Sequence, residues 1–137
     1  MSSNIKKFDE IAGEMLGILY ENFPTPKNLI FIEMAGLDES SLDDVGRLPS
    51  EARFYKDTAS WLVKAGYIWV KKDDHYYLQD AILSTKALEV LKLIPSSLTG
   101  NESIGERLAG AVKTGSTEVL KSAVTMAFSE GVKLING

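Results

Sequence analysis

The sequence has 137 residues, of which 45% are hydrophobic, so the chain can bury one ordinary core or one small domain with an appendage. It contains no cysteine and only one histidine, His75, which excludes disulfides, thiolate metal sites and histidine-cluster metal sites. No apolar run reaches the roughly 18 residues of a membrane span, and residues 1–4 lead into a charged helix rather than a signal peptide. We therefore expect a cytoplasmic protein with no metal, no cofactor and no membrane contact.

The net charge of −4 and the pI near 5.0 bear on nucleic-acid binding, because nonspecific DNA affinity comes mainly from cationic side chains. An acidic total argues against a strong DNA-binding protein, although the local distribution of charge decides the outcome. The negative charge is concentrated before residue 52, and the chain after it is mildly basic. A basic surface is therefore expected only from the later part of the sequence.

A first helix is predicted over residues 3–22, where apolar side chains recur at helical spacing, and Phe23-Pro24 ends it. Gly13 and Gly17 lie outside the apolar arc, although each costs roughly 1 kcal/mol against alanine inside a helix. Either the two glycines are a tolerated surface feature, or another element packs closely against them. That element would be the C-terminal tail or a second subunit.

Two less regular segments follow the first helix. Residues 27–36 are almost uniformly apolar, and the segment is too short for periodicity to separate a helix from a strand. Residues 37–49 are polar and acidic and are predicted to form a loop with one helical turn. The carboxylates of this loop lie just before the next helix, which weakens any role of that helix in DNA binding.

A second long helix is predicted over residues 50–65, because Ser50 suits a helix cap and Gly66 supplies the stop. Helical spacing places an apolar side on Phe54, Thr58, Trp61, Leu62 and Ala65. The same spacing places Arg53, Lys56, Ser60 and Lys64 on the opposite side, with Asp57 among them.

A β-hairpin is predicted directly after this helix. Residues 67–70 and 76–83 are rich in β-forming side chains, and the polar stretch 71–75 between them is predicted to be the turn. His75 is expected to be exposed in that turn. Five aromatic residues are expected to lie in the core or in cross-strand pairs rather than in a ligand site, namely Trp61, Tyr67, Trp69, Tyr76 and Tyr77.

This order of elements resembles a known family. Residues 8–94 resemble a winged helix-turn-helix domain, and Leu83-Ser84-Thr85-Lys86-Ala87 is similar to the Leu-Thr-x-Lys-Gly junction that follows the wing in many bacterial members. Ser84 replaces the usual Thr and Ala87 the usual Gly. The chain also resembles short bacterial winged-helix proteins with a Phe-Pro element after the first helix and a long helical tail. The resemblance implies that residues 27–36 form a short helix.

We therefore predict a mostly α fold with a small β-hairpin, of the α+β class. The winged-helix domain is assigned to residues 1–95, and a C-terminal helical extension to residues 96–137. Within the domain, a short helix is expected over residues 85–93, with Ser84 as its cap. The polar connector 96–100 is the one candidate boundary between the two parts.

The C-terminal extension is predicted to contain two helical segments. Ser103 and Glu106 have the spacing of a capping box, so the first segment starts at Ile104. Along one continuous helix, the apolar stripes before and after Thr114-Gly115-Ser116 would be rotated by roughly 100°. A break or kink is therefore expected at this tripeptide.

The extension is more apolar than one docking contact needs, and we predict that it pairs two copies of the chain, because two-fold homodimers are the commonest oligomers. The residues assigned to the dimer interface are Leu108, Val112, Val119, Leu120, Ala123, Val124, Ala127 and Phe128. The alternative is a tail that wraps back on its own domain. A membrane-surface helix is disfavoured, because the polar side carries equal numbers of lysines and glutamates.

The candidate DNA-binding residues are Arg53, Lys56, Ser60 and Lys64 on the helix and Lys71 and Lys72 on the wing. Lysine and arginine contact phosphates, and an arginine can recognise a guanine edge. Against this assignment, Asp57 has the spacing to pair with Arg53, and Asp73 and Asp74 neutralise the wing lysines.

No catalytic set is recognisable in the sequence, which lacks a Gly-rich phosphate loop and a Ser-His-Asp arrangement at a known junction. We therefore predict a non-enzymatic winged-helix adaptor or transcriptional regulator that acts as a homodimer. The alternative is a protein-interaction module of winged-helix fold that has lost DNA binding. The two alternatives differ in the partner, which is DNA in one and a protein in the other.

Overall fold

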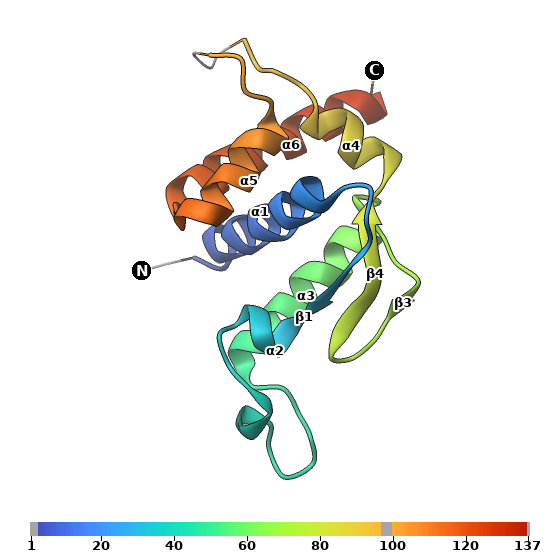
Figure 1. The fold of residues 1–137 in the computed structure, drawn as a ribbon, viewed down its shortest axis with the longest axis vertical. Coiled ribbons are helices and arrows are strands. Elements are labelled where there is room, and N and C mark those ends of the chain that lie inside the picture. Colours follow the sequence, from blue (N-terminus) through green and yellow to red (C-terminus); the bar gives the residue numbers. More distant parts are fainter. Residues whose placement is uncertain (1–2, 97–99, 137) are drawn as a thin grey trace.

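Helices make up most of the computed structural model, which describes residues 3–96 and 100–136 (Figure 1). The elements are α1 (Asn4–Asn22), β1 (Lys27–Ile30), α2 (Phe31–Met34), the 3-10 turn η1 (Glu39–Ser41), α3 (Ser50–Lys64), β2 (Ile68–Trp69), β3 (Lys72–Asp73), β4 (Tyr77–Leu83), α4 (Thr85–Leu91), α5 (Ile104–Thr114) and α6 (Thr117–Asn136). The predicted class, mostly α with a small antiparallel sheet, is confirmed. None of the described helices is long and apolar enough to cross a bilayer. Of the predicted connector, residues 97–99 lie outside the described part.

The sheet is centred on β4, which pairs antiparallel with β1 on one edge and with β2 and β3 on the other. The helix predicted over residues 27–36 is wrong, because residues 27–30 form a strand and only Phe31–Met34 are helical. Leu29 lies opposite Leu78 in β4. The backbone of this apolar run is therefore satisfied by a partner strand distant in sequence, which local periodicity does not reveal.

The predicted hairpin is present, with its first strand interrupted into β2 and β3. Both pieces keep one register with β4, since Ile68 lies opposite Leu83 and Lys72 lies opposite Gln79. The turn is shorter than predicted and falls between Asp73 and Tyr77. Its tip does not project freely, because the Tyr76 hydroxyl donates a hydrogen bond to the Gly46 carbonyl at 2.7 Å. The hairpin is thus tied to the acidic loop before α3.

The Ser84-Thr85-Lys86 junction closes the C-terminal end of α3. The Ser84 hydroxyl donates to the Gly66 carbonyl at 2.6 Å and accepts from the Ala87 amide at 3.1 Å, while the Lys86 ammonium donates to the Ala65 carbonyl at 2.6 Å. Carbonyls left without partners by the last turn of α3 are therefore satisfied by the start of α4. The predicted Ser84 cap is confirmed.

The two ends of α3 differ in how well the sequence predicted them. The stop at Gly66 is confirmed, with a left-handed φ of +83°. The start is corrected, because Ser50 is the first helical residue and Pro49 occupies the cap position without a side-chain hydrogen bond. Proline lacks an amide hydrogen and has a fixed φ, so it is well suited to the entry of a helix.

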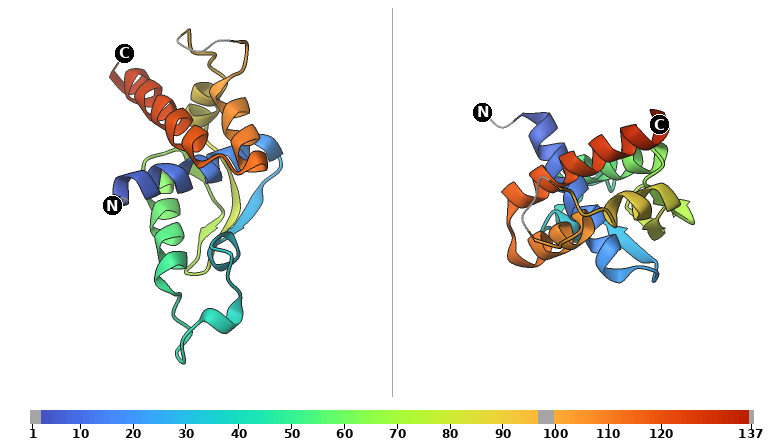
Figure 2. Two further views of the ribbon diagram at one scale, coloured as in Figure 1. Left: turned by 90° about the vertical axis from the view of Figure 1, so that its left-hand side faces the viewer. Right: turned by 90° about the horizontal axis from the view of Figure 1, so that it is seen from above.

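Helix α1 lies between the C-terminal helices α5 and α6 on one side and α3 with the sheet on the other (Figures 1 and 2). The predicted capping box of Ser103 and Glu106 is present at the start of α5. The predicted break also occurs, since Gly115 adopts a φ of +74° and α6 begins at Thr117. This break turns the apolar stripe of α6 onto α1.

The residues assigned to a dimer interface are instead used within the chain, which corrects that assignment. Leu108, Leu120, Ala123, Val124 and Ala127 are buried, and Val112, Val119 and Phe128 are half-buried against the same core. The alternative, a tail that wraps back on its own domain, describes this packing. A homodimer stays a prediction and would need a surface other than these side chains.

Gly13 and Gly17 form the groove on α1 that receives the tail. A β-carbon at Gly13 would lie 2.8 Å from the Leu120 carbonyl oxygen, and one at Gly17 would lie 2.9 Å from the Leu108 carbonyl oxygen. Both distances are shorter than van der Waals contact, so only glycine lets α5 and α6 approach α1 this closely. Of the two interpretations of the glycine pair, close packing by the tail is confirmed.

We expect Gly17→Ala to lower the free energy of unfolding by about 1–3 kcal/mol, because the new methyl group overlaps the Leu108 carbonyl. The matched control is Gly110→Ala, at a solvent-exposed position of α5 with no neighbouring atom within 4 Å. There alanine is expected to stabilise the helix by up to about 1 kcal/mol. Urea unfolding of both variants measures the two effects. An unchanged midpoint for Gly17→Ala would contradict close packing of the tail on α1.

Candidate interaction surface

The outward side of α3 differs from the one that helical spacing predicted. The buried residues of α3 are Ala52, Thr58, Ala59 and Leu62, whereas Trp61 is 47% exposed and Phe54 is half-buried. The reason is the close approach of α3 to α1 and α2, which favours small alanine side chains in the contact. Phe54 and Trp61 therefore lie at the edge of this helix contact.

The expectation that the aromatic residues lie in the core or in cross-strand pairs holds only in part. Tyr67 is buried and Tyr77 is half-buried. Trp69 is 56% exposed but lies opposite Ile82 in the pairing of β2 with β4, as expected for a cross-strand position. Trp61 and Tyr76 are exposed and lie outside the strands. Large aromatic side chains are therefore exposed to solvent. Trp61 belongs to α3, which carries four of the candidate DNA-binding residues, and Trp69 belongs to β2, which precedes the other two.

The predicted DNA-binding residues of α3 do share one side of the helix. Arg53 and Lys64 are exposed and Lys56 and Ser60 are half-buried, and none of the three cations forms an ion pair with any residue in the described part of the chain. The expected pairing of Asp57 with Arg53 is thus not formed. The Ser60 hydroxyl donates to the Asp73 carboxylate at 3.4 Å, which places the hairpin beside α3.

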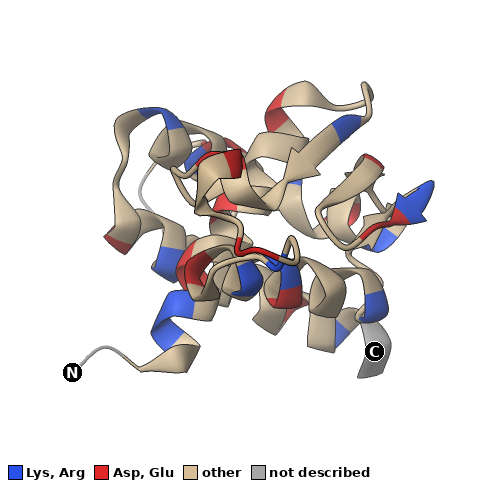
Figure 3. Ribbon diagram, turned by 90° about the horizontal axis from the view of Figure 1, so that it is seen from below, with Lys and Arg blue, Asp and Glu red and all other residues tan. Residues whose placement is uncertain are grey.

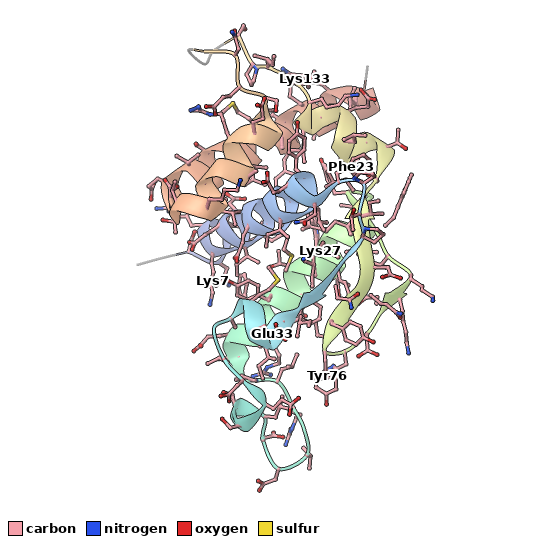
Figure 4. All side chains as sticks on the ribbon, viewed as in Figure 1. Lys7, Phe23, Lys27, Glu33, Tyr76 and Lys133 are labelled. Carbon is pink, nitrogen blue, oxygen red and sulfur yellow. The ribbon has the colours of Figure 1, made fainter. Side chains whose placement is uncertain are left out.

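The hairpin brings both signs of charge to this surface. Lys71 and Lys72 are exposed, and Lys72 pairs with Asp74 at 3.7 Å. The hairpin tip, marked by Tyr76 in Figure 4, is held against the acidic loop before α3. Figure 3, which views this end of the molecule, shows basic and acidic segments interspersed. The lysines therefore do not form a continuous basic surface.

An apolar groove of about 430 Å³ lies between α3 and the first turns of α1. It is lined by Asn4, Ile5, Phe8, Phe54, Asp57, Thr58 and Trp61. Ile5 is 69% exposed, although the sequence placed it on the apolar arc of the first helix. The exposure of Ile5 follows from its position in the first turn of α1, where residues 3–7 are all exposed.

The wall of the groove is held by an aromatic cluster that involves the tail. Phe128 of α6 packs against Trp61 with 5.7 Å between ring centroids and against Phe8 with 5.9 Å. Phe8 and Trp61 meet edge to face at 5.1 Å, and Tyr67 meets Phe128 at 5.3 Å. Such contacts fix ring orientation beyond simple burial. The tail therefore supports the groove from behind without covering it.

A second, polar cavity of about 680 Å³ lies where α1 meets α3, and its lining mixes Lys6, Lys7 and Lys121 with Glu10 and Glu51. Tyr55, which also lines it, donates a hydrogen bond to the Glu14 carboxylate at 3.0 Å. Burial raises the pKa of Glu14 above its usual value, although this hydrogen bond acts in the opposite direction. Burial, followed by the nearby Glu14 charge, raises the pKa of Tyr55 as well.

No protein-family model matches the sequence, and no curated protein or solved structure is significantly similar to it. Function is therefore inferred from the surfaces of the chain itself. In residues 3–96 and 100–136, no three His, Asp or Glu side chains are placed to hold a metal ion. The apolar groove and the cations beside it are the features that distinguish one surface from the rest.

We expect Glu14→Gln to raise the melting temperature at pH 7. The raised pKa means that the folded chain holds the Glu14 proton more tightly than the unfolded chain, so this group lowers stability as the pH rises above its usual pKa of 4.5. Glutamine removes the buried charge and keeps an acceptor for the Tyr55 hydroxyl. The gain should shrink as the pH falls toward 4, which thermal unfolding across pH measures.

The control is Glu118→Gln, because a hydrogen bond from Lys121 lowers the pKa of Glu118 in the folded chain. This group stabilises the folded state above its usual pKa, so its replacement should slightly lower the melting temperature at pH 7. A Glu14→Gln variant that melts lower than the wild type at pH 7 would contradict the burial argument.

Proposed function

We propose that this chain is a non-enzymatic adaptor of the winged helix-turn-helix class that binds a protein partner through the exposed side of α3. The class is supported by the order of elements, in which β1 lies between the first two helices and pairs with the last strand of the hairpin. The junction from Ser84 to Lys86 supports it further, since it links the hairpin, α3 and the following helix.

The observation that carries the partner-binding function is the apolar groove beside α3. Contiguous exposed apolar surface on an otherwise well-packed chain marks interaction sites. Ile5 and Trp61 are the exposed members of this surface, and full burial of a side chain such as isoleucine contributes about 1.5–3 kcal/mol. In specific complexes a few side chains contribute most of the affinity, so a partner that covers Ile5 and Trp61 would obtain much of its affinity from these two residues.

The chemistry of the groove favours binding over catalysis. Its lining offers one carboxylate, Asp57, one buried hydroxyl, Thr58, and one amide, Asn4, among apolar side chains. Acid–base or nucleophilic catalysis requires a second group within hydrogen-bond reach of the first. The groove therefore supports a role in recognition.

A second candidate function is DNA binding, and one observation favours it. Arg53, Lys56 and Lys64 lie on the exposed side of α3 without ion pairs to other described residues, so they are available to phosphates. The acidic total of the chain and the tethering of the wing to an acidic loop act against this function. DNA binding is therefore ranked below protein binding.

For the adaptor function, we expect a photo-crosslinking residue in place of Ile5 to capture a discrete partner in the host cells, identified by mass spectrometry. Capture should fall at least fivefold with Trp61→Ala and stay unchanged with Trp69→Ala, which removes a comparably exposed tryptophan outside the groove. The same crosslinker in place of Gly110, at an exposed position of α5, should capture nothing. Equal capture from both positions would contradict a partner site at the groove.

For the DNA function, gel shifts with mixed genomic DNA at about 50 mM salt give the most sensitive measurement, because counterion release helps most there. DNA binding by the wild type should be abolished by Arg53→Glu with Lys56→Glu. The control pair Lys27→Glu with Lys92→Glu makes the same charge change on other elements and should leave binding within about twofold. Absence of any shift with the wild type would eliminate this function.

A further inference from the structure

We propose that the groove between α1 and α3 receives a short acidic segment of the partner protein that carries bulky apolar side chains. This inference rests on the proposed adaptor function and adds the chemistry of the partner. The volume of the groove, about 430 Å³, lies within the usual range of binding clefts and accommodates a few large side chains. Ile5, Phe8, Phe54 and Trp61 give these side chains an apolar surface to cover.

The groove is organised before binding. Trp61 packs against Phe8 and Phe128, which come from α1 and α6, so three helices fix its ring. A rigid aromatic anchor loses little conformational freedom when a partner covers it, which favours affinity. Ile5, with 69% of its surface exposed, lies on the opposite wall. The partner is therefore expected to place one apolar side chain between these walls.

The charges around the groove determine the sign of the partner. The Lys7 ammonium lies 4.7 Å from the centroid of the Phe54 ring, at the start of α1 (Figure 4). On α3, Arg53 directly precedes Phe54, and Lys64 lies one helical turn after Trp61. Asp57 is the only acidic side chain of the lining. Asp9 follows Phe8 on α1, so three cations lie beside two carboxylates, and this excess of positive charge favours a segment whose own carboxylates flank its apolar residues.

The same charges argue against a second copy of the chain as the occupant. A two-fold interface places the same surface of both copies face to face, so two surfaces that each carry an excess of cations from Lys7, Arg53 and Lys64 would meet. Like charges that face each other weaken an interface. A bilayer is also a poor occupant, because the groove is concave and Asp57 faces into it. An acidic peptide segment meets both the apolar and the charged requirements.

The test is selection of peptides from a random display library on the full chain, with counter-selection on Trp61→Ala. Enriched peptides should carry at least two large apolar residues and a net negative charge. Fluorescence anisotropy of an enriched peptide should show binding about tenfold weaker for Trp61→Ala and about threefold or more weaker for Lys7→Glu. Affinity should also fall as salt increases, because the contact is partly electrostatic.

Matched controls separate the groove from general effects of substitution. Trp69→Ala and Lys27→Glu remove a comparable exposed tryptophan and lysine outside the groove, and both should leave affinity within about twofold. Ile5→Ser provides a groove variant whose side chain is mostly exposed, so folding should be retained. Circular dichroism checks that every variant keeps its helix content. A groove variant that folds normally and binds the peptide as well as the wild type overturns the proposal.

Other occupants give distinct results. Self-association of the wild type in sedimentation, lost in Ile5→Ser, would replace the acidic segment with a second copy. Flotation with phosphatidylserine vesicles, lost in the same variant, would replace it with a membrane. Enriched peptides that are basic or lack large apolar residues would overturn the inferred chemistry while crosslinking from position 5 still supports an adaptor. Failure of both selection and crosslinking removes both proposals.

Discussion

The close approach of the tail to α1 is the constraint on which the rest of the structure depends. Gly13 and Gly17 remove the side chains that would hold α5 and α6 away, so backbone carbonyls of the tail helices lie against α1. A contact this close allows dense packing and leaves no room for added atoms. It also fixes where Phe128 lies, and through Phe128 it fixes the ring of Trp61. The tail therefore shapes the groove without lining it.

The contact between α1 and α3 separates two surfaces of different chemistry. On one side lies the apolar groove, and on the other lies the polar cavity with the Tyr55–Glu14 hydrogen bond. Lys7 belongs to both, since it lines the cavity and lies over the Phe54 ring. A partner carboxylate that reaches Lys7 would therefore meet a cation at the boundary between apolar and polar surface. Lys7 is therefore the residue that the proposed acidic segment would contact at this boundary.

The candidate site was only partly predictable from the sequence. Helical spacing correctly placed Arg53, Lys56, Ser60 and Lys64 on one side of α3. It placed Trp61 in the core, because hydrophobicity favours burial, whereas close helix packing selected Ala52 and Ala59 instead. The groove also needed the first turn of α1, which is some fifty residues away in sequence. Its composition therefore depended on a contact that no local pattern encodes.

The sequence by itself determined the local features of the helix ends, because these depend on local hydrogen bonding. They are the Ser84 cap, the Ser103–Glu106 capping box, the stop at Gly66 and the break at Gly115. Each of these depends on residues within one helical turn, so a short stretch specifies it. Only the tertiary structure decided that residues 27–30 pair as a strand, that the tail covers its own α1, and that Trp61 faces solvent. These outcomes depend on packing between segments far apart in the chain. Several segments are equally hydrophobic, so the fit of their shapes decides which of them pack together.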